Sequence, residues 1–145
     1  MLYTTLTKKA MKIAFAAHKE QVDKSGLPYI FHPFHLAEQM ETEETVCAAL
    51  LHDVAEDTEI TLEELQKEGF PRQVLAALAL LTHYEAVPYM EYVAKVKENP
   101  VARAVKLADL RHNSDLTRLD YVDEKAKERA EKYKAAMALL LEEDA

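Results

Sequence analysis

Glycine and proline are rare in this sequence, and they interrupt long stretches in which apolar residues recur at helical spacing. The 145 residues include only two glycines and five prolines. Gly26 and Gly69 stand where a chain would turn, and the prolines separate the periodic stretches from one another. No stretch shows the sustained apolar–polar alternation of a half-buried strand. The pattern predicts an all-α fold.

The predicted helices fill the stretches between these interruptions. Thr61 and Glu64 form a capping box for a short helix that stops at Gly69, and Asp123 can cap the last helix. The other helices are expected at 5–23, from Pro33, at 43–55, from Pro71, at 88–98, at 100–113 and at 124–142. The last of these alternates in charge and is expected to be a solvated outer element. Residues 1–145 are therefore predicted to form one compact helical domain, which is large enough to bury a core.

Charge and cysteine content narrow the functional classes. Lys and Arg number 18 and Asp and Glu 26, so the net charge of −8 argues against DNA or RNA binding and against attraction to anionic membranes. Cys47 is the only cysteine, which excludes an internal disulfide and fits a reducing compartment. The N-terminus lacks a signal-like apolar stretch, and no apolar run could span a bilayer. A cytoplasmic location is expected.

Four ionisable residues interrupt the apolar helix expected at 43–55. His52, Asp53, Glu56 and Asp57 occupy one arc of it, beside an arc of apolar side chains. A helix this apolar must pack on several sides, so the ionisable arc is expected to face a pocket. Buried carboxylates need hydrogen bonds, cations or a metal, because leaving them without partners costs several kcal/mol or more.

Two other segments carry similar anomalies. Asp109 continues an inward-facing stripe of the helix at 100–113, and His32 precedes a helix start in an apolar setting. With His52 and Asp53, these residues offer two imidazoles and two carboxylates, a mixed set that suits Mn²⁺, Fe²⁺ or Zn²⁺. Each residue alone also has a structural interpretation, and Asp109 could instead be paired with Lys106 or Arg103.

Three motifs resemble a known enzyme family. They are KSGLPYIFHP at 24–33, LHDVAEDT at 51–58 and VKLADLRHN at 105–113. The spacing of their histidines and aspartates resembles the HD superfamily of metal-dependent phosphohydrolases. The longer motifs are similar to the hydrolase domain of RelA/SpoT-type (p)ppGpp enzymes and to the small alarmone hydrolases. The resemblance covers about residues 7–119.

This resemblance implies a set of roles and a reaction. His32, His52, Asp53 and Asp109 would hold one Mn²⁺, Glu56 and Asp57 would be the catalytic acidic pair, and Lys24, Tyr29 and Asn113 would bind the nucleotide. A divalent metal lowers the pKa of bound water and polarises a phosphoryl oxygen. In the family, the reaction removes the 3′-pyrophosphate of (p)ppGpp and gives GDP or GTP and pyrophosphate. The implied partner is a small-molecule nucleotide.

Two departures from the family pattern leave the base preference open. Asp23 stands before Lys24 where many relatives carry arginine, and Ser114, Asp115 and Leu116 follow Asn113 where relatives often continue with Met-Arg-Thr. Two alternatives therefore remain. One is a generic HD-domain nucleotidase or phosphomonoesterase, and the other is a non-catalytic, metal-dependent nucleotide-binding module. The sequence does not indicate the oligomeric state.

Overall fold

Helix α3 (Glu43–Asp57) runs through the middle of the molecule and is buried along most of its length. All nine residues of 46–54 are buried, and α3 contacts α1, α2, α5 and α7. Its alanines and the small Cys47 let neighbouring helices approach closely on several sides. Three of its buried positions, Cys47, Ala48 and Ala49, thus carry no bulky side chain, and the surrounding helices supply the rest of the core.

The computed structural model describes residues 1–142, so the last three residues of the predicted domain 1–145 lie outside the described residues. Within 1–142 the chain forms α-helices, one short 3₁₀ helix and a single isolated bridge between Val22 and Pro28, which confirms the all-α prediction. Besides α3, the elements in chain order are α1 (Thr5–Ala17), α2 (Phe31–Glu38), α4 (Leu62–Lys67), α5 (Arg72–Leu81), α6 (Tyr89–Lys97), α7 (Pro100–Asn113), η1 (Leu116–Arg118) and α8 (Glu124–Leu141).

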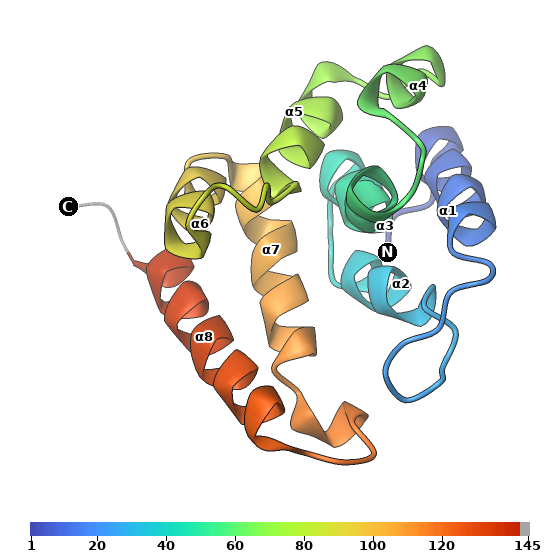
Figure 1. Ribbon diagram of the computed structural model, residues 1–145. Helices are drawn as coiled ribbons and strands as arrows, with labels where there is room; N and C mark the ends of the chain where they lie inside the picture. The colour runs from blue at the N-terminus through green and yellow to red at the C-terminus, as the bar shows by residue number, and fades with distance from the viewer. Residues whose placement is uncertain (143–145) are drawn as a thin grey trace.

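Helices α2, α3 and α7 lie side by side and carry the candidate site (Figure 1). Helix α7 has the predicted range: Asn99 caps it by accepting from the backbone N–H groups of Val101 and Ala102, and Pro100 occupies the first turn. Helix α3 continues two residues beyond the predicted end at Ala55. This extension keeps Glu56 and Asp57 on the same helix as His52 and Asp53.

The prediction that the first helix reaches residue 23 is wrong. Helix α1 ends at Ala17, and residues 18–30 form a loop, which we call the 18–30 loop. The Asp23 side chain accepts from the backbone N–H groups of Ser25 and Leu27, at 2.9 and 3.0 Å, and Gly26 takes a positive φ of 81°. These local hydrogen bonds compete with the helix and turn the chain before α2.

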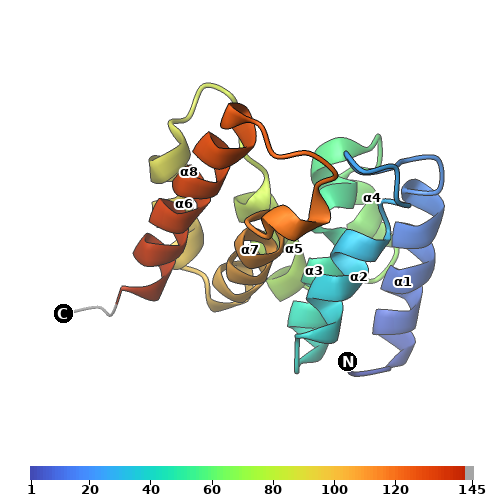
Figure 2. The same cartoon turned by 90° about the horizontal axis from the view of Figure 1, so that it is seen from below.

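Helix α8 is more than the solvated outer element expected from its charges. Its exposed face carries ion pairs such as Lys127–Glu124. The opposite face is buried at Ala126, Ala130, Ala136 and Leu140 and packs against α6 and α7 (Figure 2). No helix among the described residues combines the length and apolar character needed to cross a membrane.

Candidate functional site

Four side chains from three helices meet at the centre of the candidate site. Helix α2 contributes His32, α3 contributes His52 and Asp53, and α7 contributes Asp109, and all four are buried. His32 Nε2 lies 2.8 Å from Asp109 Oδ1 and 3.8 Å from Asp53 Oδ2. His52 Nε2 lies 3.2 Å from Asp53 Oδ2 and 3.7 Å from Asp109 Oδ1. The predicted donors, which we call the donor cluster, therefore converge.

The hydrogen bonds of His52 test whether this cluster fits a divalent metal ion. His52 Nδ1 lies 2.7 Å from the carbonyl oxygen of Ala49, which can only accept, so the ring hydrogen is on Nδ1. In the neutral ring, the buried Nε2 then presents a lone pair, and it has no hydrogen-bond partner. Donor atoms of His32, His52 and Asp109 lie within 4.8 Å of one another. A metal ion among them would use the unpartnered nitrogen and offset the negative charge of the carboxylates, so the residues fit a divalent cation.

Three neighbouring side chains fix the two carboxylates. Tyr29 Oη donates to Asp53 Oδ2 at 2.6 Å. Lys106 Nζ donates to Asp109 Oδ2 at 3.0 Å, and Asn113 Nδ2 donates to Asp109 Oδ1 at 3.1 Å. Lys106 therefore does pair with Asp109, through the oxygen that does not face His32. Such outer partners orient metal ligands and hold them in place.

The pKa shifts in the cluster follow from burial and charge. Burial alone would raise the pKa of Asp109, but Lys106, together with His32 and His52, holds it well below the usual range. Burial opposes the charged form of His52, yet Asp53 and Asp109 more than offset this and raise its pKa. The pKa of Asp53 is lowered, because the nearby His52 outweighs the effect of burial. The two aspartates are therefore kept ionised, as metal ligands must be.

Glu56 and Asp57 lie in the last turn of α3, where both side chains keep contact with solvent. Partial burial and the negative charges of Asp57 and Asp53 raise the pKa of Glu56. Partial burial and Asp53 raise the pKa of Asp57 as well. Two carboxyl groups with raised pKa values beside the donor cluster are suited to accept or donate protons.

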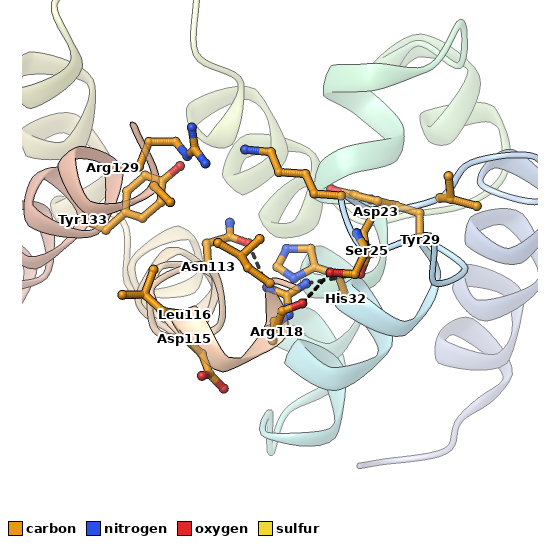
Figure 3. A pocket seen from close by; sticks show the side chains of 14 residues that line it. Asp23, Ser25, Tyr29, His32, Asn113, Asp115, Leu116, Arg118, Arg129 and Tyr133 are labelled. Carbon is orange, nitrogen blue, oxygen red and sulfur yellow. Dashed lines mark hydrogen bonds and ion pairs between the residues drawn. The ribbon is translucent and has the colours of Figure 1, made fainter. Parts of the chain in front are cut away.

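A cavity of about 340 Å³ adjoins the donor cluster at His32 (Figure 3). The three residues predicted to bind nucleotide, Lys24, Tyr29 and Asn113, all line it. Its volume is in the range of small-molecule sites, about 300–1,000 Å³. Glu56 and Asp57 are not among its lining residues.

The sequence analysis missed several residues of the cavity wall. Arg118 comes from η1, and Arg129 and Tyr133 come from α8 (Figure 3). Arg129 and Tyr133 stand four residues apart and so share one face of the helix. This spacing is the signal by which the sequence could have indicated them. The surrounding charged residues hid that signal. Lys24 and the two arginines line the cavity together with two acids, Asp23 and Asp115, so cationic side chains outnumber anionic ones there.

The two acids that depart from the family pattern both have local structural roles. Asp23 fixes the 18–30 loop through its backbone hydrogen bonds and lies 3.9 Å from Arg118 Nη2. Asp115 caps η1 by accepting from the backbone N–H of Thr117 at 3.0 Å. The Ser25 hydroxyl also donates to the carbonyl oxygen of Arg118 at 2.6 Å. The loop and η1 are thus joined at one side of the cavity.

Comparisons with known proteins agree with this fold. A family model described as an HD domain matches residues 10–140, and the chain belongs to this family. A guanosine-3′,5′-bis(diphosphate) 3′-pyrophosphohydrolase of Aquifex aeolicus is 36% identical over 113 residues, which cover 70% of this chain and 16% of that protein. The enzyme of the same name from Mus musculus, MESH1, is 37% identical over 120 residues, covering 72% of this chain and 66% of MESH1.

A solved structure shares the fold over the whole chain. It is described as a metazoan ortholog of SpoT that hydrolyzes ppGpp, and it matches with a TM-score of 0.77 at 22% identity. The match covers 100% of this chain and 90% of that one. The chain thus spans a small part of the Aquifex relative and about two thirds of the mouse relative.

Proposed function

We propose that this protein is a metal-dependent hydrolase that removes the 3′-pyrophosphate of guanosine 3′,5′-bispyrophosphate, (p)ppGpp, or of a closely related nucleotide. The products would be GDP or GTP and pyrophosphate. The observation that carries the proposal is the position of the donor cluster, which lies directly beside a cavity whose lining includes the cationic side chains of Lys24, Arg118 and Arg129. The names of the Aquifex and mouse relatives support the same substrate.

The proposed cofactor is one Mn²⁺ held by His32, His52, Asp53 and Asp109, with Fe²⁺ and Zn²⁺ as alternatives. Two imidazoles and two carboxylates form a mixed donor set of the kind that these ions accept. When bound, the ion would supply Lewis-acid activation of water and of a phosphoryl oxygen. The unpartnered Nε2 of buried His52 is the structural feature that favours an ion at this position.

The acidic pair would handle the protons of the reaction. Glu56 stands one turn from His52 on α3, a position from which its carboxylate can take a proton from the attacking water. Asp57 has a pKa raised by partial burial and by Asp53. It can therefore hold a proton for the leaving oxygen. This division of roles between the two acids is part of the proposal.

The cavity wall would bind the nucleotide. The proposed substrate carries two pyrophosphate groups, so a protein with a net charge of −8 needs local cations to bind it. Lys24, Arg118 and Arg129 supply these charges from three different segments. Tyr29 and Asn113 connect the wall to the donor cluster, because each lines the cavity and also hydrogen bonds to an aspartate of the cluster.

The decisive experiment mixes the purified protein with Mn²⁺ and ppGpp and measures pyrophosphate and orthophosphate separately. Pyrophosphate release that stops on addition of EDTA supports the proposal. Orthophosphate release favours the generic nucleotidase, and tight nucleotide binding without turnover favours the binding module. Adenine nucleotides of the same phosphate pattern, assayed in parallel, measure the base preference.

Thermal melting checks the metal independently of any substrate. A ligand that binds only the folded state stabilises it by mass action, by about 2.7 kcal/mol at a hundredfold excess over its Kd. Adding Mn²⁺ to the EDTA-treated protein should therefore raise Tm. Identical melting curves with and without Mn²⁺ would contradict a metal site.

A further inference from the structure

A histidine outside the donor cluster is hydrogen bonded to one of its members. His112 Nδ1 lies 2.7 Å from His32 Nδ1. The two ring planes differ by only 6°, and their centroids are 5.0 Å apart. The separation of the two ring centroids exceeds the distance between the two Nδ1 atoms by about twice the length from an imidazole centre to its own nitrogen. The rings therefore lie edge to edge in nearly one plane, and the hydrogen bond runs along the lone-pair direction of both nitrogens.

The geometry fixes which ring donates when His32 binds a metal ion. Two Nδ1 atoms at hydrogen-bond distance hold one hydrogen between them, so one ring donates and the other accepts. If His32 gives the lone pair of Nε2 to an ion, the hydrogen of the neutral ring is on Nδ1. His112 Nδ1 is then the acceptor. Histidine ligands regularly donate their second N–H to such a partner, which sets the tautomer and orients the ring.

The structure also fixes the position of His112. Its backbone lies in the last turn of α7, three residues after Asp109, and its carbonyl oxygen accepts from Arg118 Nη1 at 2.9 Å. The ring of His35 packs against the ring of His112, with centroids 4.2 Å apart. Helix α7 thus contributes one member of the donor cluster, Asp109, and also His112, which hydrogen bonds to Nδ1 of His32.

We propose that His112 is a positioning residue for the metal centre, which holds His32 in the tautomer and orientation that direct Nε2 at the ion. The inference rests on the proposed metal site and adds a residue to it that does not touch the ion. The proposal gives the hydrogen bond of His112 a partner, His32, and a direction, with His32 as the donor.

Calorimetric titration of the EDTA-treated protein with Mn²⁺, without substrate, tests the proposal. His112→Phe keeps a ring but removes the acceptor, and we expect the Kd for Mn²⁺ to rise about 10–100-fold, the usual effect of losing such a partner. His112→Asn places a carbonyl oxygen near the position of Nδ1, and we expect it to restore most of the affinity. The matched control is His35→Phe, which alters the neighbouring ring but not the hydrogen bond, and which should bind as the wild type does.

Two results of the titration would overturn the proposal. One is a folded His112→Phe variant with wild-type affinity, and the other is equal weakening by Phe and Asn, which would make packing the cause. If the wild-type protein binds Mn²⁺ and the His112→Phe variant binds it equally well, only this inference is overturned, and the proposed metal site is unaffected. Absence of binding by the wild type would overturn the proposed metal site together with it.

Nitrogen NMR of the wild-type protein provides a second readout that needs no variant to fold. With diamagnetic Zn²⁺ as the probe, we expect hydrogen on Nδ1 of His32 and none on Nδ1 of His112. A Zn²⁺-bound protein with the hydrogen on His112 Nδ1 would overturn the proposal.

Discussion

The donor cluster and the cavity beside it are built from different kinds of structure. The cluster sits on α2, α3 and α7, which pack against one another around buried side chains. Most of the cavity wall comes instead from the 18–30 loop, the segment 114–119 and the outermost helix, α8. In the cluster each fully buried side-chain nitrogen or oxygen has a hydrogen-bond partner, apart from His52 Nε2. The wall is held together by contacts such as the hydrogen bond from the Ser25 hydroxyl to the carbonyl oxygen of Arg118.

This difference predicts how substitutions in the two regions will behave. Removing one member of a buried, hydrogen-bonded cluster leaves its partners unpaired, so stability and metal binding should change together. Side chains of the wall reach the cavity individually and are partly solvated. Their removal should give graded losses of substrate affinity with little effect on the fold.

The largest effect is expected for Asp109→Ala. The variant loses a proposed metal donor and leaves the largely buried ammonium of Lys106 without its carboxylate. Breaking a buried pair in this way costs about 3–5 kcal/mol. We expect no measurable Mn²⁺ binding, hydrolysis at background, and a loss of this size in chemical denaturation without metal.

Asp123→Ala is the matched control for Asp109. Its exposed carboxylate caps α8 by accepting from the backbone N–H of Ala126 at 2.8 Å. Losing such a cap costs about 1 kcal/mol, and Mn²⁺ affinity should not change. Equal destabilisation by the two variants would contradict the view that Asp109 belongs to a buried network.

Glu56→Gln is expected to separate catalysis from metal binding. If Glu56 takes the proton of the attacking water, its removal should lower kcat about 10²–10⁴-fold. Because Glu56 is not among the donors, the Kd for Mn²⁺ should stay within a few-fold of the wild type. Glu59→Gln, the same change at the next exposed glutamate along the chain, should leave kcat unaltered. Unchanged turnover in Glu56→Gln would remove the general-base role.

The contrast between the two regions also explains what could be predicted from the sequence. The all-α class and the range of α7 followed from apolar periodicity and from Pro100 at the helix start. The donor cluster could be proposed because buried acids and histidines are unusual in apolar helices. Helical spacing also places them on faces that turn inward. Their meeting point depended on packing between segments far apart in the chain, which periodicity does not contain.

The cavity wall depended on interactions that the sequence does not reveal. The early end of α1 follows from side-chain hydrogen bonds of Asp23 within the 18–30 loop, which outweigh helical propensity there. Arg129 and Tyr133 stand in a helix whose charges are mostly solvated, and only packing against α6 and α7 shows which face turns inward. The Asp23–Arg118 pair joins residues 95 positions apart.

Arg129→Met tests the wall directly. Its guanidinium lines the cavity, and hydrogen bonds to charged groups contribute about 1.5–3 kcal/mol. We therefore expect kcat/KM for ppGpp to fall about 10–100-fold, mainly through KM, with Tm nearly unchanged. Lys125→Met, the same change at an exposed position of α8 outside the cavity, should have wild-type kinetics. A fall in kcat alone would place Arg129 in the chemical step instead of in binding.

The smallest effect is expected for Asp57→Asn, measured as the Tm of the EDTA-treated protein. Partial burial and Asp53 raise the pKa of Asp57, so the folded state binds this proton more tightly than the unfolded state. The carboxyl group therefore favours folding only while it is protonated, and that contribution is lost as pH rises through the raised pKa. Above the ordinary aspartate pKa, this preference for the proton costs stability, so Asn, which cannot ionise, should raise Tm at pH 7 by a small amount.

The pH dependence of this gain identifies its cause. As pH falls below the ordinary aspartate pKa, about 3.9, the wild-type carboxyl is protonated in both states and the advantage of Asn should disappear. Asp120→Asn, at an exposed position outside the site, should leave Tm unchanged at both pH values. A gain that persists in acid would mean that the amide makes a new contact. A loss of Tm at pH 7 would mean that the ionised carboxylate stabilises the fold. Only the expected pattern fits an acid whose preference for its proton lowers stability at neutral pH and serves the proposed reaction.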